Sequence, residues 1–159
     1  MLLLLDEFAA LGRPEPALQA AGLMAGLGLQ LWPILQDLTQ LRATYGQHAG
    51  TFLANAGIVQ VAAPADLDTA EWLSKSLGNA TVGYETGNQS RSTPDLLASA
   101  HGSTSAGTSS HLTARPLLAP DEAMRLPPHA QVLLRPGHPP ALVAKLRHYA
   151  DAEFTGLFD

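Results

Sequence analysis

An uninterrupted apolar run near the start of the chain ends at two adjacent carboxylates. Residues 2–5 are all leucine, and Asp6 and Glu7 follow directly. Because apolar and polar residues do not alternate in this run, it predicts a strand buried on both faces, as in a parallel sheet. Open α/β sheets bind ligands at the carboxyl ends of their strands. The two carboxylates are therefore expected on the rim of a sheet, where a ligand can reach them.

The same pattern is typical of the Walker B motif of P-loop ATPases. In that motif the aspartate, here Asp6, holds the Mg²⁺ of the nucleotide, and the following glutamate, here Glu7, orients the attacking water. The alternative interpretation is an ordinary buried strand that enters a polar turn, because a pattern of eight residues has low specificity.

A second apolar segment, residues 29–36, predicts another strand, and it ends in Gln36 and Asp37. Two strand ends would then present a carboxylate pair and an amide to one crevice. A glutamine amide can hydrogen-bond a γ-phosphate oxygen or the attacking water without adding charge. The alternative is that Gln36 is an ordinary residue at the end of a strand.

The order of the expected elements predicts an α/β fold. Strands are expected at residues 2–5, 29–36 and 57–62, and helices at about 14–26, 38–45, 49–55 and 67–77. Asp37 or Thr39 is expected to cap the second of these helices, and Asp66 the fourth. Alternating strands and helices of this length predict a three-layer, mostly parallel sheet.

The second half of the chain differs in composition from the first. A short strand is expected at residues 80–85, and residues 88–113 are rich in Ser, Thr and Gly, which predicts a flexible insertion. A short helix is expected to begin at Pro120. Residues 131–135 and 141–147, joined by a short turn rich in proline, predict a closing antiparallel pair.

Composition limits the classes of partner and site. The chain of 159 residues is 46% hydrophobic and only 14% charged, which indicates surface that is hidden against a partner domain or other subunits. A net charge of −5 argues against a main nucleic-acid-binding surface. The chain has no cysteine, and no two of its six histidines fall at ligand spacing on one expected element, so neither a thiolate site nor a zinc site is expected.

Five segments, in order along the chain, resemble the TraG/TraD family of type IV secretion coupling proteins. They are LLLLDEFAALGR from residue 2, LWPILQDLTQL from residue 31, FLANAG from residue 52, RPLLAPDEAMRLP from residue 115 and LRHY from residue 146. The family consists of conjugative DNA-pumping ATPases related to the FtsK and HerA motors. The resemblance implies the C-terminal part of a RecA-like P-loop ATPase domain, from Walker B onward, including the region called the TraM recognition site.

By position, the resemblance implies that Asp6 coordinates Mg²⁺, that Glu7 positions the catalytic water and that Gln36 senses the γ-phosphate. It implies an intact parent that binds ATP and Mg²⁺ between the subunits of a homo-hexamer and moves single-stranded DNA through the central channel. The implied partners are a TraM-like relaxosome protein and the type IV secretion channel. The implied location is the cytoplasmic face of the bacterial inner membrane, with the membrane anchor outside this chain.

The chain departs from the family pattern in three ways. It contains no G-x-x-x-x-G-K-[ST] motif, hence no phosphate cradle. Ala25 and Gln30 occupy places where family members often carry arginines, and the membrane anchor is missing. The buried strand at the very start of the chain further suggests that the N-terminal part of the domain is absent.

We therefore expect that the chain alone binds neither ATP nor Mg²⁺ tightly and does not hydrolyse ATP. The resemblance implies that the P-loop strand of the family lies in the same sheet as the strand at residues 2–5. We therefore also expect low solubility or oligomerisation, because loss of the P-loop strand would expose apolar edges and faces. Two alternatives stay open. One is a non-enzymatic docking module that binds a relaxosome or substrate protein, and the other is a decayed gene fragment.

Overall fold

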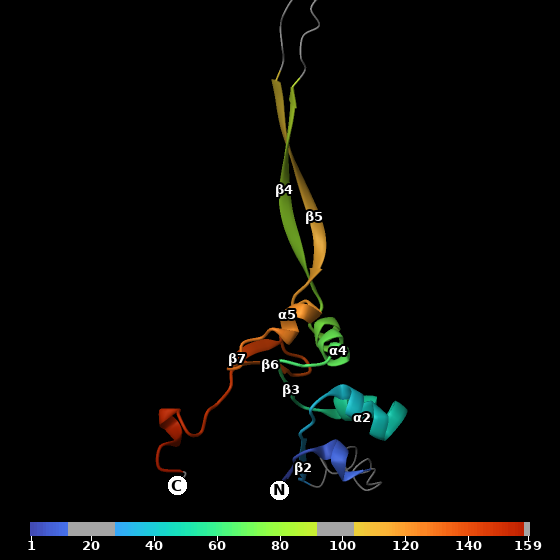
Figure 1. Cartoon of the computed structure of the whole chain (residues 1–159), viewed down its shortest axis with the longest axis vertical. Helices are drawn as coiled ribbons and strands as arrows, with labels where there is room; N and C mark the ends of the chain where they lie inside the picture. The colour runs from blue at the N-terminus through green and yellow to red at the C-terminus, as the bar shows by residue number, and fades with distance from the viewer. Residues whose placement is uncertain (13–27, 92–103, 158–159) are drawn as a thin grey trace, which may run out of the picture. The chain divides into compact units, whose positions relative to one another are not determined.

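The computed structural model describes residues 1–12, 28–91 and 104–157, which form two compact units (Figure 1). One unit comprises Met1–Leu77 and Leu118–Asp159, and the other comprises Gly78–Leu117. The helix expected at residues 14–26 lies outside the described residues. All three expected site residues belong to the first unit.

The first two strands form a parallel pair. β1 (Leu2–Leu5) runs beside β2 (Gln30–Pro33). The pairing continues past the strand ends, because the N–H of Ile34 donates to the carbonyl of Leu5 at 2.8 Å. Pro33, which has no N–H to donate to a ladder, is the last residue of its strand. The predicted parallel arrangement of these two strands is confirmed.

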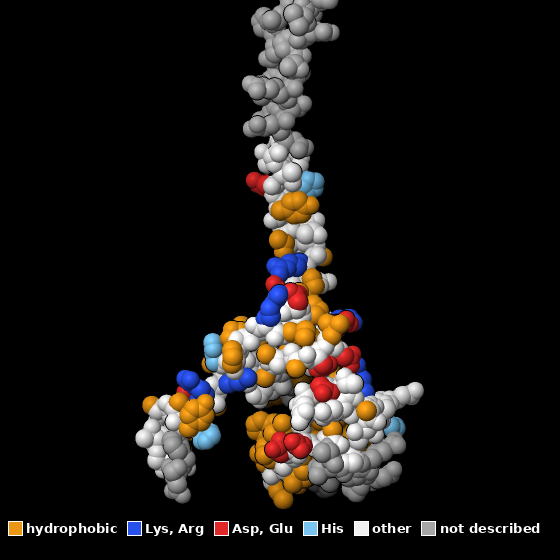
Figure 2. All heavy atoms as spheres, in the orientation of Figure 1, with side chains coloured by type: hydrophobic (Ala, Val, Ile, Leu, Met, Phe, Trp, Pro, Cys, Tyr) orange, Lys and Arg blue, Asp and Glu red, His pale blue; other side chains and the backbone are white. Residues whose placement is uncertain are grey.

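The prediction that β1 is buried on both faces is wrong. Leu2 and Leu4 each expose 54% of their surface, and Trp32 of β2 exposes 48%. Figure 2 shows apolar side chains gathered over this strand pair. Among the described strands β1 pairs with β2 alone, so its other edge has no neighbour there. Leu5, at the carboxyl end of the strand, packs against the core.

The three longer helices of the first unit have the bounds that the sequence predicts. They are α2 (Leu38–Tyr45), α3 (Ala49–Asn55) and α4 (Leu67–Leu77), and the short 3₁₀ helices are η1 (Phe8–Leu11), η3 (Gly46–His48) and η4 (Ala152–Phe154). Asp37 and Asp66 cap α2 and α4, since each carboxylate accepts a hydrogen bond from the amide three residues later, at 2.7 and 2.8 Å. Gly46 and Gly78, with φ of 56° and 79°, follow the last residues of α2 and α4. Within the described ranges, no helix is long and apolar enough to cross a membrane.

The second sheet of the first unit is antiparallel. β3 (Val59–Ala62) pairs with β6 (Ala130–Leu134), and β6 pairs with β7 (Ala141–Ala144). The closing antiparallel pair is confirmed, as is the short helix α5 (Pro120–Met124). By contrast, β3 was expected in the parallel sheet and instead runs antiparallel to β6. The α/β class is confirmed, and its described sheets are mixed in direction.

Two hydrophobic clusters stabilise the first unit. The first joins Phe8 to the buried faces of α2 and α3, and the second joins β3 and β6 to α4 and α5. Trp72 of α4 packs against both clusters. A buried hydrogen bond from the N–H of Leu38 to Oγ1 of Thr69, at 3.0 Å, further ties the start of α2 to α4. The helices beside the expected site are therefore fixed to the rest of the unit.

The second unit is a long β-hairpin. β4 (Asn79–Arg91) and β5 (Thr104–Pro116), of 13 residues each, pair antiparallel in one continuous register (Figure 1). The sequence predicts a short strand at residues 80–85 and an irregular insertion at 88–113, whereas residues 88–91 and 104–113 continue the hairpin. A turn expected at Leu96 and Leu97 lies outside the described residues.

The physical reason for this difference is that an antiparallel ladder pairs the backbone N–H and C=O groups of its two strands by hydrogen bonds, whatever side chains the strands carry. Threonine, which recurs in these strands, and the single residues Val82 and Tyr84 also favour extended backbone. Residues 81–87 and 107–117 are exposed, so their small polar side chains lie in water. Tyr84 and His111, which are opposite each other in the register, stack with ring centroids 5.3 Å apart.

Candidate functional site

The expected site residues lie at the carboxyl ends of β1 and β2. Asp6 and Glu7 directly follow β1, and Gln36 lies in the segment between β2 and α2. Because the two strands are parallel, these ends meet at one edge of the sheet. The N–H of Phe8 donates to the carbonyl of Ile34 at 3.0 Å and holds the two connecting segments beside each other.

Phe8 anchors the acidic turn to the helical core. Its side chain is fully buried, stacks on Tyr45 of α2 with ring centroids 5.4 Å apart and meets Phe52 of α3 edge to face at 5.3 Å. Such aromatic pairs stabilise a packed cluster beyond the burial of their area. Asp6 and Glu7 are exposed, yet Phe8, which follows them, is buried in one cluster with residues of α2 and α3, against which Leu5 packs.

The backbone of Glu7 is strained. Its φ of 48° and ψ of 45° lie in the left-handed region, and among the described residues it is the one non-glycine with positive φ. A side chain in this conformation costs about 1–2 kcal/mol. The N–H of Glu7 donates to Oδ1 of Asp6 at 3.0 Å, which stabilises the turn locally. Strain of this kind persists where the surrounding structure determines the conformation, commonly at functional sites.

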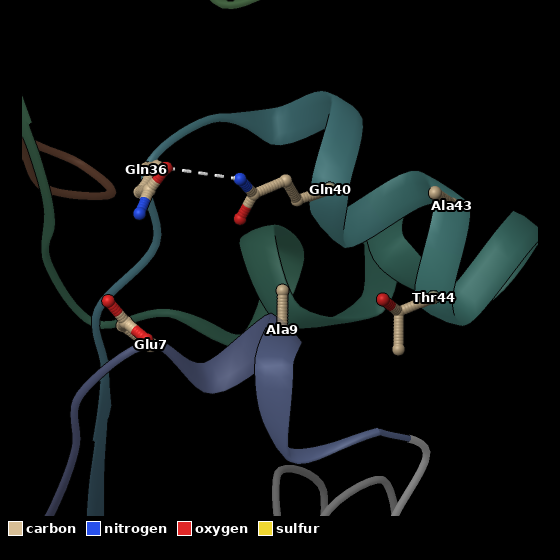
Figure 3. Close-up of a pocket in the computed structure, with 6 residues that line it drawn as sticks. All are labelled: Glu7, Ala9, Gln36, Gln40, Ala43 and Thr44. Carbon is tan, nitrogen blue, oxygen red and sulfur yellow. Dashed lines mark hydrogen bonds between the residues drawn. The ribbon is translucent and has the colours of Figure 1, made fainter.

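Glu7 and Gln36 line one open hollow. Its volume is about 340 Å³, and its walls are Glu7, Ala9, Gln36, Gln40, Ala43 and Thr44 (Figure 3). The structure thus brings Glu7 and Gln36 together on one cavity, whereas Asp6 lies beside it and is not part of its wall. Nε2 of Gln40 donates to Oε1 of Gln36 at 3.3 Å.

The chemistry of this wall fits one end of a nucleotide site. A carboxylate can accept a hydrogen bond from water and orient it, and an amide nitrogen can donate to a phosphate oxygen. Mg²⁺ in nucleotide sites needs only one or two protein carboxylates, because phosphates and waters complete its shell. No cluster of three or more metal-ligating side chains occurs among the described residues.

The residues do not fit the phosphate-binding end of such a site. Glu7 is the one ionisable residue of the wall, so the hollow by itself repels a polyphosphate. The sequence holds no glycine-rich loop with a lysine to offset that repulsion. Of the two places expected to bear arginine in the family, Gln30 lies exposed on β2, and Ala25 lies outside the described residues.

Gln40 and Thr44, which were not predicted from the sequence, complete the polar part of the wall. They lie four residues apart on α2, and Gln40 is four residues after Gln36. Residues spaced by four share one face of a helix, so the spacing of Gln40 and Thr44 was a usable signal for a shared face.

Comparison with known proteins gives consistent matches. The family model for type IV secretory system conjugative DNA transfer matches residues 1–157. Protein VirD4 of Agrobacterium fabrum (strain C58 / ATCC 33970) is 31% identical over 164 residues, which cover 100% of this chain and 23% of the relative. Conjugal transfer protein TraG of Escherichia coli is 34% identical over 131 residues, which cover 80% of this chain and 20% of the relative. The chain thus spans about a fifth to a quarter of the length of these relatives.

The fold is similar to that of solved coupling-protein structures. The unbound bacterial conjugative coupling protein TrwBdeltaN70 matches with a TM-score of 0.64 and 24% identity, over 90% of this chain and 31% of that chain. The plasmid coupling protein TrwB in complex with ADP and Mg²⁺ matches with a TM-score of 0.62 and 22% identity, over 90% and 30% of the two chains. This likeness confirms the RecA-like α/β fold class.

Proposed function

Because the chain belongs to the type IV secretory system conjugative DNA-transfer family, we propose that it supplies the hydrolytic edge of a coupling ATPase. The observation that carries this proposal is that Glu7 and Gln36, from the ends of two parallel strands, line one hollow. In the proposed parent protein, ATP hydrolysis drives single-stranded DNA and protein substrates toward a type IV secretion channel.

Each site residue has a distinct proposed role. Glu7 accepts a hydrogen bond from the attacking water and aims it at the γ-phosphate. Gln36 donates its amide N–H to a γ-phosphate oxygen, and Asp6, at the same turn, holds the Mg²⁺ shell. When bound, ATP would supply the electrophilic phosphorus, and Mg²⁺ would supply positive charge that partly offsets the repulsion between Glu7 and the phosphates.

The rest of the nucleotide site is proposed to come from other parts of the parent. The exposed leucines of β1 support this, as does the edge of β1 that has no neighbour among the described strands, because such a surface favours a covering layer. The missing phosphate cradle supports the further proposal that this chain alone neither binds ATP and Mg²⁺ tightly nor hydrolyses ATP. We place the parent at the cytoplasmic face of the bacterial inner membrane, as a homo-hexamer with ATP between subunits and DNA in its channel.

A second candidate function is docking without catalysis. The observation in its favour is the β4–β5 hairpin, a separate unit whose exposed strands have two free edges among the described residues. Such edges can pair with a strand of another protein. The proposed partner is a TraM-like relaxosome protein. A pull-down in which the isolated chain retains a purified relaxosome protein, and a variant without residues 80–115 does not, would support docking.

ATPase measurements test the primary proposal. The isolated chain is expected to show no hydrolysis. In a longer protein that carries this segment behind a phosphate-binding loop, Glu7→Gln is expected to lower kcat by about 10²–10⁴ without preventing ATP binding. Glu71→Gln, which changes an exposed glutamate paired with Lys75 on α4, is the matched control and should leave kcat unchanged. Hydrolysis by the isolated chain that depends on Glu7, or a longer protein in which the two variants behave alike, would contradict the proposal.

A further inference from the structure

We propose that a groove in the first unit, away from Glu7 and Gln36, docks a short segment of a partner protein that is both acidic and apolar. The groove has a volume of about 250 Å³ and is lined by residues of α3, β3, α4, β6 and the turn that joins β6 to β7. It shares no wall residue with the hollow that holds Glu7 and Gln36. The inference therefore goes beyond the proposed hydrolytic role.

The apolar wall of the groove is part of the hydrophobic core. Val59 of β3 and Leu134 of β6, which are partners in the register, line the groove together with Trp72 of α4. All three side chains pack against the second hydrophobic cluster, so the core fixes their positions. Because this wall is formed before any ligand arrives, little ordering is needed on binding, which lowers the cost of association.

The turn between β6 and β7 forms the polar rim of the groove. The N–H of His138 donates to the carbonyl of Arg135 at 3.1 Å, and both residues line the groove. Between them lie Pro136 and Gly137, and the glycine has a φ of 75°. Proline followed by a glycine of positive φ fits a type II turn. The backbone that carries Arg135 is therefore held in one conformation.

The charge at the groove is positive, although the whole chain carries a net charge of −5. No aspartate or glutamate occurs among the described residues that line it, and Arg135 is the one permanent cation of that lining. The exposed Arg135 guanidinium has no ion pair with a described residue, whereas Arg42, Arg125 and Arg147 each pair with an aspartate. A cation without a partner beside an apolar wall is complementary to a carboxylate on an apolar segment.

The size and the charge of the groove favour a peptide over other ligands. Small-molecule sites usually measure about 300–1,000 Å³, so this groove suits a side chain of a longer segment better than a whole cofactor. A nucleic acid would need several cations along its backbone, and the described lining holds one permanent cation. Tryptophan and arginine are the residue types that most often dominate protein interfaces. The apolar side chain of the segment lies against Trp72, and a neighbouring carboxylate pairs with Arg135.

The fluorescence of Trp72 measures this binding directly. The chain has two tryptophans, and Trp32→Phe, on β2 outside the groove, leaves Trp72 as the only one. The probe is the peptide acetyl-GDLFEDG-amide, and its neutral counterpart is acetyl-GNLFQNG-amide. A saturable change in the emission of Trp72 is expected with the acidic peptide, and the neutral peptide should bind about threefold to tenfold more weakly. Equal binding of the two peptides, or no change in emission with either, would overturn the proposal.

Arg135→Gln and Arg125→Gln are a matched pair of variants, since each removes one exposed cation and only Arg135 lines the groove. Arg135→Gln should weaken binding of the acidic peptide by about threefold to tenfold and leave the neutral peptide unaffected. Arg135→Lys keeps the charge and should recover part of the loss. Arg125→Gln should change neither affinity. A merely distorted groove would bind both peptides more weakly, so an equal loss for the two peptides, or for the two glutamine variants, would contradict the assigned pairing.

Sedimentation velocity distinguishes a partner peptide from a second copy of this chain in the groove. If a second copy occupied the groove, Arg135→Gln and added acidic peptide would each reduce self-association. The expected result is that neither changes the sedimentation distribution, while the peptide still alters the emission of Trp72. Self-association that falls with both would overturn the assignment to a partner protein.

Discussion

Replacing Glu7 by glycine should stabilise the fold, although the change removes the proposed catalytic carboxylate. With φ of 48° and ψ of 45°, this residue carries a side chain in the left-handed region, at a cost of about 1–2 kcal/mol. Glycine avoids that cost but loses more conformational freedom on folding, worth about 0.4–1 kcal/mol. The net expected gain in unfolding free energy is about 1 kcal/mol, which raises Tm by about 2–4 °C for a chain of this size.

Alanine variants supply the control for this prediction. Glu7→Ala keeps the strain, so Glu7→Gly should be the more stable of the two. At Glu71, inside α4, the order should reverse, because glycine in a helix interior is about 1 kcal/mol less favourable than alanine. Thermal and urea unfolding of the four variants measure both orders. If Glu7→Ala proves as stable as Glu7→Gly, the reasoning from backbone strain is refuted.

Three further predictions concern the core, the exposed strand face and pH. Phe8→Ala removes a fully buried ring and should lower the unfolding free energy by about 3–5 kcal/mol, measured by urea denaturation. Replacing the exposed Leu2 and Leu4 together by threonine should reduce self-association in sedimentation velocity while moving Tm little, and equal association would contradict the proposed role of that face. Burial alone would raise the pKa of the Asp66 carboxyl, but hydrogen bonds from the Thr69 side chain and backbone outweigh it, and the pKa lies below its ordinary value of 3.8. The ionised Asp66 carboxylate therefore stabilises the fold fully at pH values above 3.8, and this stabilisation is lost as the pH falls through the lowered pKa. The difference in Tm between the native chain and Asp66→Ala should shrink on acidification. A difference in Tm that stays constant with pH would exclude this linkage.

The parts of the fold that the sequence predicted are those fixed by local chemistry. Asp37, Asp66 and the glycines that follow two helices define helix ends through hydrogen bonds and backbone conformations within a few residues. The short turn between β6 and β7 likewise determines that these strands run antiparallel. Helix caps and short turns depend on residues close together in the sequence, so they can be predicted from the sequence alone.

The features that the sequence did not predict depend on distant residues or on backbone alone. The direction of β3 is set by its pairing with β6, some 70 residues later in the chain, as the partners Val61 and Val132 illustrate. The exposure of Leu2 and Leu4 depends on which layer covers them, not on their own apolar character. The paired strands at residues 79–91 and 104–116 need only paired backbone groups, so their composition resembled that of an irregular loop.

The candidate site likewise has features that the sequence predicts and features that it does not. The carboxylates and Gln36 could be located because strand ends are visible in the pattern of apolar residues. The left-handed backbone of Glu7 and the hydrogen bond from Gln40 could not, because both arise from how the β1–η1 turn and α2 are held against the core.

A crystal structure of a longer protein that contains this segment and a phosphate-binding loop, with ADP, Mg²⁺ and tetrafluoroaluminate, tests the proposed site most directly. The expected result is that the Glu7 carboxylate lies within about 2.6–3.2 Å of the water in line with aluminium. The Gln36 nitrogen should lie at a similar distance of about 2.7–3.2 Å from an equatorial fluoride. A nucleotide bound away from the hollow, with neither Glu7 nor Gln36 in contact with the phosphate analogue or its water, would contradict the proposed function.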